Sequence, residues 1–150
     1  MHRVRKFIVL PTKKENAKKE IEELLKEAKL PYQKIEEELI GNSPIIWITS
    51  PEEKKIISFF KKRNMKAFPS NTSIVKLKDK PGEVAKIARI LVSSGLEVED
   101  AHLILKSKST ALYGIITNKP AEADRLIQKI VKSLQETEEE DVQEQPSQDY

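Results

Sequence analysis

A short run, Asp79-Lys80-Pro81-Gly82-Glu83, has residue types and spacing that could bind a small anion. Pro81 presets φ for the first turn of a helix, and Gly82 has no Cβ, so a ligand can approach the backbone closely. The first N–H groups of a helix lack partners within the helix, and the helix dipole favours negative charge beside them. A carboxylate would suit this loop. An ordinary strand-to-helix turn fits the same residues equally well, because Pro and Gly are common turn residues.

Composition excludes most other kinds of site. The 150 residues include no Cys, so there is no disulfide, no thiolate nucleophile and no Cys-based metal site. His2 and His102 are too few for a histidine metal cluster, and no Ser or acid stands at a recognisable spacing from them for a catalytic triad. Four Gly in all exclude glycine-rich nucleotide-binding loops. We therefore expect no catalytic residue, no metal and no cofactor, and we interpret His102 as a half-buried structural residue.

Hydropathy indicates where in the cell the protein is located, and charge indicates the character of its C-terminal segment. The apolar run at 7–10 is shorter than the roughly 7–15 residues of a signal-peptide core. No stretch approaches the roughly 18 apolar residues of a membrane span, so we expect a cytoplasmic protein with no membrane partner. The net charge of +3 conceals a segment, 135–150, that holds seven acidic residues and no basic one. We interpret 135–150 as a disordered acidic tail.

The hydrophobic pattern alternates between short strands and amphipathic helices, and it repeats. The halves align at a period of about 68 residues, with Phe7 on Val75 and Ile48 on Ile116. In the first half, the expected strands are 7–10, 32–40, 45–49 and 65–68, and the expected helices lie between 12 and 30 and from 51 to 63. In the second half, the expected strands are 73–77, 96–105 and 110–117, and the expected helices run from 82 to 94 and from 120 to 134.

This order predicts an α+β fold of two ferredoxin-like βαββαβ units, each an antiparallel sheet with helices on one face. The expected divisions are 1–70, 71–134 and the tail 135–150. We expect the two sheets to be packed together or continuous. The second unit lacks a convincing fourth strand, so another unit or a second chain should cover its open edge. The alternation of apolar and polar residues changes phase near Asp100, which suggests a β-bulge. Gly114 could mark another bulge, or it could let a ligand or a neighbouring strand approach the backbone closely.

The second half resembles the opening of an ACT domain. The resemblance rests on the strand 75–78, the Asp79-Lys80-Pro81-Gly82 loop, a helix with small apolar residues, and Gly95-Leu96-Glu97-Val98 after it. It covers about 73–134. The first half has the same order of elements but Pro11-Thr12-Lys13-Lys14 in place of the loop, and we interpret it as a degenerate copy. The chain looks like a stand-alone tandem ACT protein with no catalytic domain.

The resemblance implies a non-catalytic, allosteric regulatory protein, a homodimer that binds a small molecule, most often an amino acid, where two ACT domains meet. Glu97 stands where some amino-acid-binding relatives have Asn, and Glu97 or Asp79 would face the ligand's ammonium group. Leu77 stands where some of them have His, so the identity of the ligand stays open. The alternative to a ligand contact is that Glu97 is a strand residue that faces solvent. The ligand-binding residues that the resemblance implies are Asp79, Lys80, Pro81, Gly82, Glu83, Val84, Glu97 and Val98.

Two other functions are compatible with the same order of elements. RNA-recognition motifs share it, and the body of the chain is basic. Its basic residues alternate with Glu along the helices, however, and the strand 110–117 holds one aromatic residue, Tyr113, so we rank RNA binding lower. A subunit that regulates a separate partner enzyme through protein contacts fits as well as a ligand sensor does.

Overall fold

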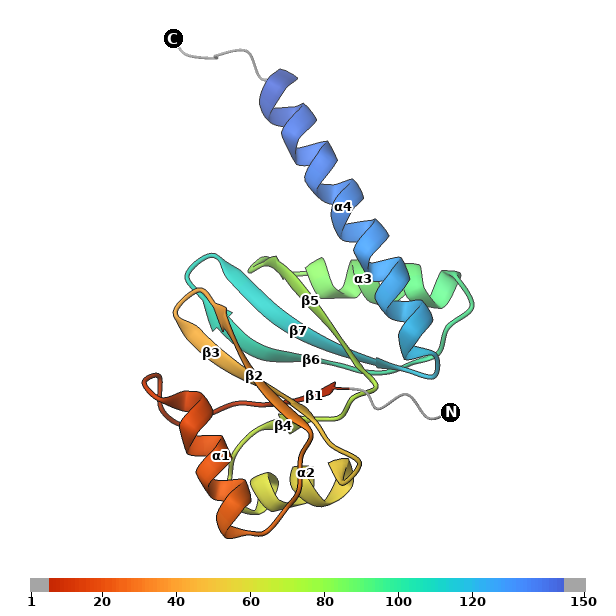
Figure 1. The fold of residues 1–150 in the computed structure, drawn as a ribbon. Coiled ribbons are helices and arrows are strands. Elements are labelled where there is room, and N and C mark those ends of the chain that lie inside the picture. The colour runs from red at the N-terminus through yellow and green to blue at the C-terminus, as the bar shows by residue number, and fades with distance from the viewer. Residues whose placement is uncertain (1–5, 145–150) are drawn as a thin grey trace.

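The computed structural model describes residues 6–144, which form two α+β units joined by a short linker (Figure 1). The linker at 69–71 lies at the boundary expected from the sequence. The first unit comprises β1 (Lys6–Val9), α1 (Ala17–Glu27), β2 (Lys34–Ile40), β3 (Ser43–Thr49), α2 (Glu53–Lys62) and β4 (Ala67–Phe68). The second unit comprises β5 (Thr72–Lys78), α3 (Glu83–Ser93), β6 (Val98–Ser107), β7 (Thr110–Thr117) and α4 (Pro120–Glu144).

Each unit is an antiparallel sheet covered by its own pair of helices. Sheet A has the strand order β2-β3-β1-β4, and sheet B has the order β5-β7-β6. Alternate strand residues such as Phe7 and Val75 point towards the helices, where Phe60 and Leu91 complete two separate cores. The predicted fold class is confirmed. Both units have the β-α-β-β-α order that the sequence predicts.

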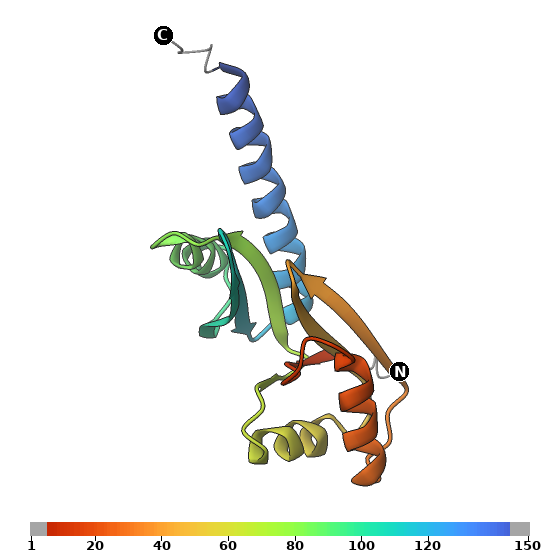
Figure 2. The same ribbon diagram turned by 90° about the vertical axis from the view of Figure 1, so that its left-hand side faces the viewer.

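The two sheets pack face to face through the sides that carry no helices, so the molecule has four layers (Figure 2). This third core joins Ile8 and Ile45 of sheet A to Ile104 and Leu112 of sheet B, and Trp47 packs against it. The sheets are therefore packed rather than continuous. An RNA-recognition motif binds RNA on an open sheet face. Because both sheets bury that face against each other, the structure argues against the RNA-binding alternative.

The second unit has no fourth strand within the described residues. The chain continues α4 as far as Glu144 instead of turning back beside β5. The expectation of a disordered tail is therefore wrong for 135–144, because Glu and Gln are good helix formers and a helix that has already nucleated extends readily. Residues 145–150 lie outside the described part of the chain. Among the described helices, none combines the length and apolar character that a membrane crossing requires.

Candidate ligand-binding site between the two units

The loop at 79–83, expected as the ligand site, is an exposed corner of the second unit. Asp79, Lys80, Pro81 and Gly82 are all exposed, and Glu83 is partly buried. Gly82 has a φ of +85°, which L side chains rarely adopt, and a Cβ placed on it would meet no atom within 4 Å. The loop is held by the Asp79 amide, which donates to the Ser109 carbonyl at 3.0 Å.

The remaining expected site residues lie at the opposite end of sheet B. The end of β5 is in register with Thr110 at the start of β7, whereas Val98 is in register with Thr117 at its end. Seven residue steps along a strand separate the two ends, roughly 23 Å. The exposed Glu97 is held there through its backbone, whose N–H donates to Asn118 Oδ1 at 2.9 Å. One chain therefore does not bring the loop together with Glu97 and Val98.

A pocket of about 570 Å³ lies instead where β4 of sheet A meets β6 of sheet B. Both units contribute to it, because α2, the α2–β4 connection and β4 line one side while β6 and β7 line the other. Its volume is within the roughly 300–1,000 Å³ of small-molecule sites. The lining residues are Lys61, Asn64, Met65, Lys66, Ala67, Phe68, Pro69, Asp100, His102, Leu103 and Ile116.

The lining of this pocket includes a stacked aromatic pair, one ring from each unit. The Phe68 and His102 rings stack with centroids 4.8 Å apart and an interplanar angle of 16°. Gly114 makes room for the His102 ring, because a Cβ on it would lie 3.1 Å from Nε2 and 2.7 Å from the Thr72 methyl. The possibility of a close approach at Gly114 is confirmed, and the expected bulge lies between Val98 and Asp100.

Hydrogen bonding fixes the orientation of the His102 ring. Its Nδ1 lies 3.2 Å from Asp100 Oδ2, and because a carboxylate only accepts hydrogen bonds, Nδ1 is the donor. Its Nε2 is inaccessible to solvent and has no hydrogen-bond partner. The side chain as a whole is 25% exposed, which confirms the prediction of a half-buried histidine. The pocket therefore contains a ring that is held at one nitrogen and unpaired at the other.

Charges of opposite sign line this pocket from the two units. Lys61 and Lys66 lie on the side of the first unit, and Asp100 lies on the side of the second. All three are at least partly open to solvent, so a bound ligand can reach them without a buried charge being left unpaired. Met65, Leu103 and Ile116 add apolar surface between them. The arrangement can hold a small molecule with an anionic end, a cationic end and an apolar part.

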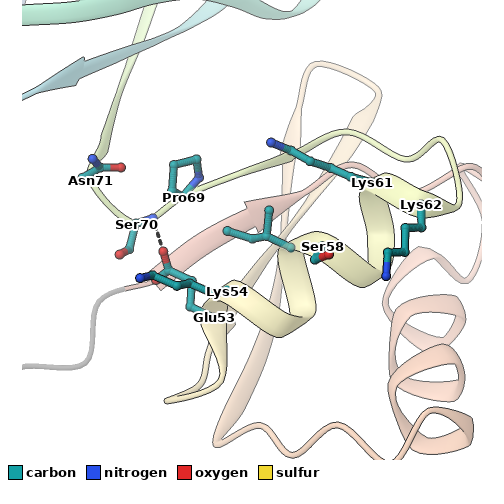
Figure 3. A pocket seen from close by; sticks show the side chains of 9 residues that line it. Glu53, Lys54, Ser58, Lys61, Lys62, Pro69, Ser70 and Asn71 are labelled. Carbon is teal, nitrogen blue, oxygen red and sulfur yellow. Dashed lines mark hydrogen bonds between the residues drawn. The ribbon is translucent and has the colours of Figure 1, made fainter.

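A second pocket, of about 680 Å³, lies along α2 beside the linker (Figure 3). It shares Lys61 and Pro69 with the first pocket, and Lys54 and Lys62 also line it. The Ser70 N–H donates to Glu53 Oε2 at 3.0 Å, which fastens the linker to the first turn of α2 (Figure 3). The linker therefore separates two adjoining pockets.

Sequence reasoning missed this site because its residues form no local motif. Lys61 and Phe68 come from one half of the chain and Asp100 from the other. The signals present were His102 two residues after Asp100 on a strand, and Gly114 within another strand. Among the side chains that the structure describes, no three acidic or histidine groups gather closely enough to hold a metal ion.

No family model and no curated protein sequence matches the chain. Solved structures of similar fold include a protein from Bacteroides thetaiotaomicron, with 13% identity, a TM-score of 0.42, and coverage of 84% of this chain and 87% of that one. The alpha and beta subunits of aspartokinase show 17% identity, a TM-score of 0.33, and coverage of 85% and 91%. The ligand-free regulatory subunit of aspartate kinase from Thermus thermophilus shows 12% identity, a TM-score of 0.34, and coverage of 85% of this chain and 93% of that one. At these values neither a ligand nor an assembly follows for this chain.

Proposed function

We propose that this chain is a non-catalytic regulatory protein that binds a small amino acid in the pocket between β4 and β6. The observation that carries this proposal is that lysines from one unit and a carboxylate from the other line one pocket together with the stacked Phe68 and His102 rings. A free amino acid has a carboxylate and an ammonium group on one carbon, and an ordered site for it needs a partner for each charge.

In this arrangement the α-carboxylate binds Lys61 or Lys66 and the α-ammonium binds Asp100. The ligand's side chain lies against Phe68 and Ile116. A ligand held by both units stabilises their relative arrangement, because it binds the folded, assembled state in preference to any state in which the units separate. That coupling would give the protein a signal to pass to a partner enzyme.

The exposed loop at 79–83 stays a second proposed location for the ligand. It would need the Glu97–Val98 end of another chain to wall it, since one chain keeps the two apart. A site of this kind exists only in an oligomer, whereas the pocket between the units exists in one chain. The two locations therefore predict different variants that abolish binding.

Calorimetric titration of the intact protein with each common amino acid tests the proposal. We expect one of them to bind, and Asp100→Asn or the double variant Lys61→Gln, Lys66→Gln to weaken that binding at least about tenfold. Lys80→Gln in the exposed loop and Glu97→Gln at the opposite end of sheet B are matched controls and should bind normally. Loss of binding in these two variants alone would move the site to the loop at 79–83 walled by the Glu97 end of another chain. A folded protein that binds no amino acid would overturn the proposed function.

A further inference from the structure

One side of α2 carries a stripe that is rich in lysine. Its members recur at the spacing i, i+3, i+4, i+7, i+8, which places them on one side of a helix. The stripe consists of Lys54, Ile57, Ser58, Lys61 and Lys62. The opposite side of the helix packs on the core of the first unit through Ile56 and Phe60. The lysine-rich stripe therefore faces away from that core.

The linker gives this side of the helix a second wall. Residues 69–71 run beside α2, and the bond from the Ser70 N–H to Glu53 Oε2, 3.0 Å long, holds them there (Figure 3). Between the helix and the linker lies the pocket of about 680 Å³, within the roughly 300–1,000 Å³ of small-molecule sites. Pro69 and Asn71 line it from the linker side. A stripe that would otherwise only meet solvent thus lines a pocket.

The lining of this pocket is mainly cationic. Three of its side chains are lysines, and one, Glu53, is acidic. Within the described residues none of the three lysines forms an ion pair, whereas Lys55, on another side of α2, lies 3.5 Å from Glu52. Several ammonium groups around one pocket suit an anion of more than one charge. A phosphate monoester carries about −1.5 to −2 at neutral pH, and lysine binds phosphate as a point charge.

Hydrogen-bond acceptors lie in the same pocket beside the lysines. Asn71 Oδ1 has no contact with solvent and accepts no hydrogen bond within the described residues. A polar atom in this state gains free energy when a donor reaches it. The Glu53 carboxylate can accept more hydrogen bonds than the one from the linker, because it has about four lone-pair sites. The hydroxyl groups of a ligand are donors that suit both acceptors.

The dimensions and the lining of the pocket favour one class of phosphate compound. Lys54 and Lys62 are eight residues apart, roughly 12 Å along the helix axis, so the stripe is longer than a single phosphate ion. Proteins that bind single-stranded nucleic acids stack the bases on aromatic side chains. None of the described residues that line this pocket is aromatic. The pocket therefore suits a phosphate on a hydroxylated carbon skeleton better than it suits a nucleobase.

We propose that the pocket between α2 and the linker binds a sugar phosphate. The phosphate binds the lysine ammonium groups and the Ser58 hydroxyl. The hydroxyl groups of the sugar donate to Glu53 and Asn71, and its carbon skeleton lies on Ile57 and Pro69. This site is separate from the pocket between β4 and β6, although Lys61 lines both.

Titration calorimetry of the full-length protein with ribose 5-phosphate and with glucose 6-phosphate tests the proposal. We expect at least one of them to bind at least about tenfold more tightly than inorganic phosphate or the unphosphorylated sugar, because each of these lacks one kind of group. AMP should bind no more tightly than ribose 5-phosphate, since no lining residue offers a ring for its base.

Two pairs of lysines provide a matched comparison. The double variant Lys54→Gln, Lys62→Gln should weaken sugar-phosphate binding at least about tenfold. The control Lys19→Gln, Lys55→Gln removes the same charge from exposed lysines that do not line the pocket, and it should bind normally. Equal losses in the two double variants would mean that the phosphate is attracted only by the overall charge, and would overturn the proposal.

Asn71→Ala separates the two parts of the proposed site. It removes an acceptor for the sugar and keeps every lysine, so it should weaken sugar-phosphate binding and leave the weaker binding of inorganic phosphate unchanged. Circular dichroism establishes that each variant is folded. Failure of both sugar phosphates to bind, binding of inorganic phosphate with equal affinity, or binding of a short single-stranded RNA in their place would overturn the proposal. The result is independent of amino-acid binding, because Lys54, Lys62 and Asn71 do not line the pocket between β4 and β6.

Discussion

The exposed loop at 79–83 and the pocket beside Phe68 differ in how the chain makes them. The loop is built from consecutive residues, so its shape can be read from the sequence, but in one chain it faces open space at Gly82. The pocket is built from residues that are far apart in the sequence, and it has walls from both units. A local motif can therefore supply groups for binding without supplying an enclosure, and the enclosure here comes from the packing of two sheets.

The largest effect that separates the two regions should come from their glycines. In Gly114→Val the new Cβ would lie 2.7 Å from the Thr72 methyl, which belongs to a stiff β-branched side chain within a strand. Overpacking of this kind should lower the free energy of unfolding by about 3 kcal/mol. Gly82→Asn should lower it by less than about 1 kcal/mol, because Asn tolerates positive φ and the space beside Gly82 is open.

Chemical denaturation of both variants provides the measurement. Equal losses in the two variants would mean that the loop is as closely packed as the interface between the sheets, contrary to the structure. A loss in Gly82→Asn that exceeds the loss in Gly114→Val would point to an enclosed loop, as in an assembly that buries it.

A smaller effect is expected from the aromatic wall of the pocket. Phe68→Ala removes a half-buried ring and should cost about 2 kcal/mol of stability. It should also shift the His102 ring protons downfield, because the Phe68 ring lies stacked 4.8 Å away and its ring current acts on them. Phe59→Ala is a matched control, since Phe59 is also half-buried but packs on Phe60 and Arg63 within the first unit.

Proton NMR identifies the His102 signals by their loss in His102→Gln. Unchanged His102 shifts in Phe68→Ala would show that the two rings are not stacked in solution. The pocket between the units would then lack its central feature, and the comparison with the exposed loop would lose its basis.

The repeat, the two kinds of element and the layers of helices could be predicted because each follows from local periodicity. The stripe Val84, Ile87, Leu91 gives one face of α3 directly, and the turn at Gly95 ends it. The continuation of α4 was missed because an acidic run resembles a disordered segment, although Glu and Gln favour helices.

The site could be predicted only in part, for a physical reason. The sequence shows that Gly114 needs an explanation and that His102 is half-buried, but nothing local places Phe68 against His102. That contact depends on which faces of the two sheets meet. The order of strands and helices is the same whether two sheets pack face to face or lie side by side, so that order does not choose between the two arrangements.

The smallest expected effect concerns an ion pair on the free edge of sheet A, compared with one at the exposed loop. Lys6 Nζ lies 2.8 Å from Glu36 Oε1, whereas Lys106 Nζ lies 3.7 Å from Asp79 Oδ2. The hydrogen bond from Lys6 lowers the pKa of the Glu36 carboxyl, desolvation opposes this, and Lys34 adds a further lowering. A carboxyl whose pKa is lower in the folded state stabilises the fold at neutral pH, and this contribution disappears as the pH falls through the lowered pKa.

Glu36→Gln should therefore be slightly less stable than the wild type at neutral pH, and the difference should vanish in acid. Asp79→Asn should change stability less, because its ion pair is longer and exposed charges are screened by solvent. Unfolding midpoints measured against pH for both variants provide the test. A difference for Glu36→Gln that grows as the pH falls would contradict the assigned sign. A larger effect at Asp79 than at Glu36 would mean that the loop at 79–83 is shielded from solvent, which is the arrangement a second chain packed against it would produce.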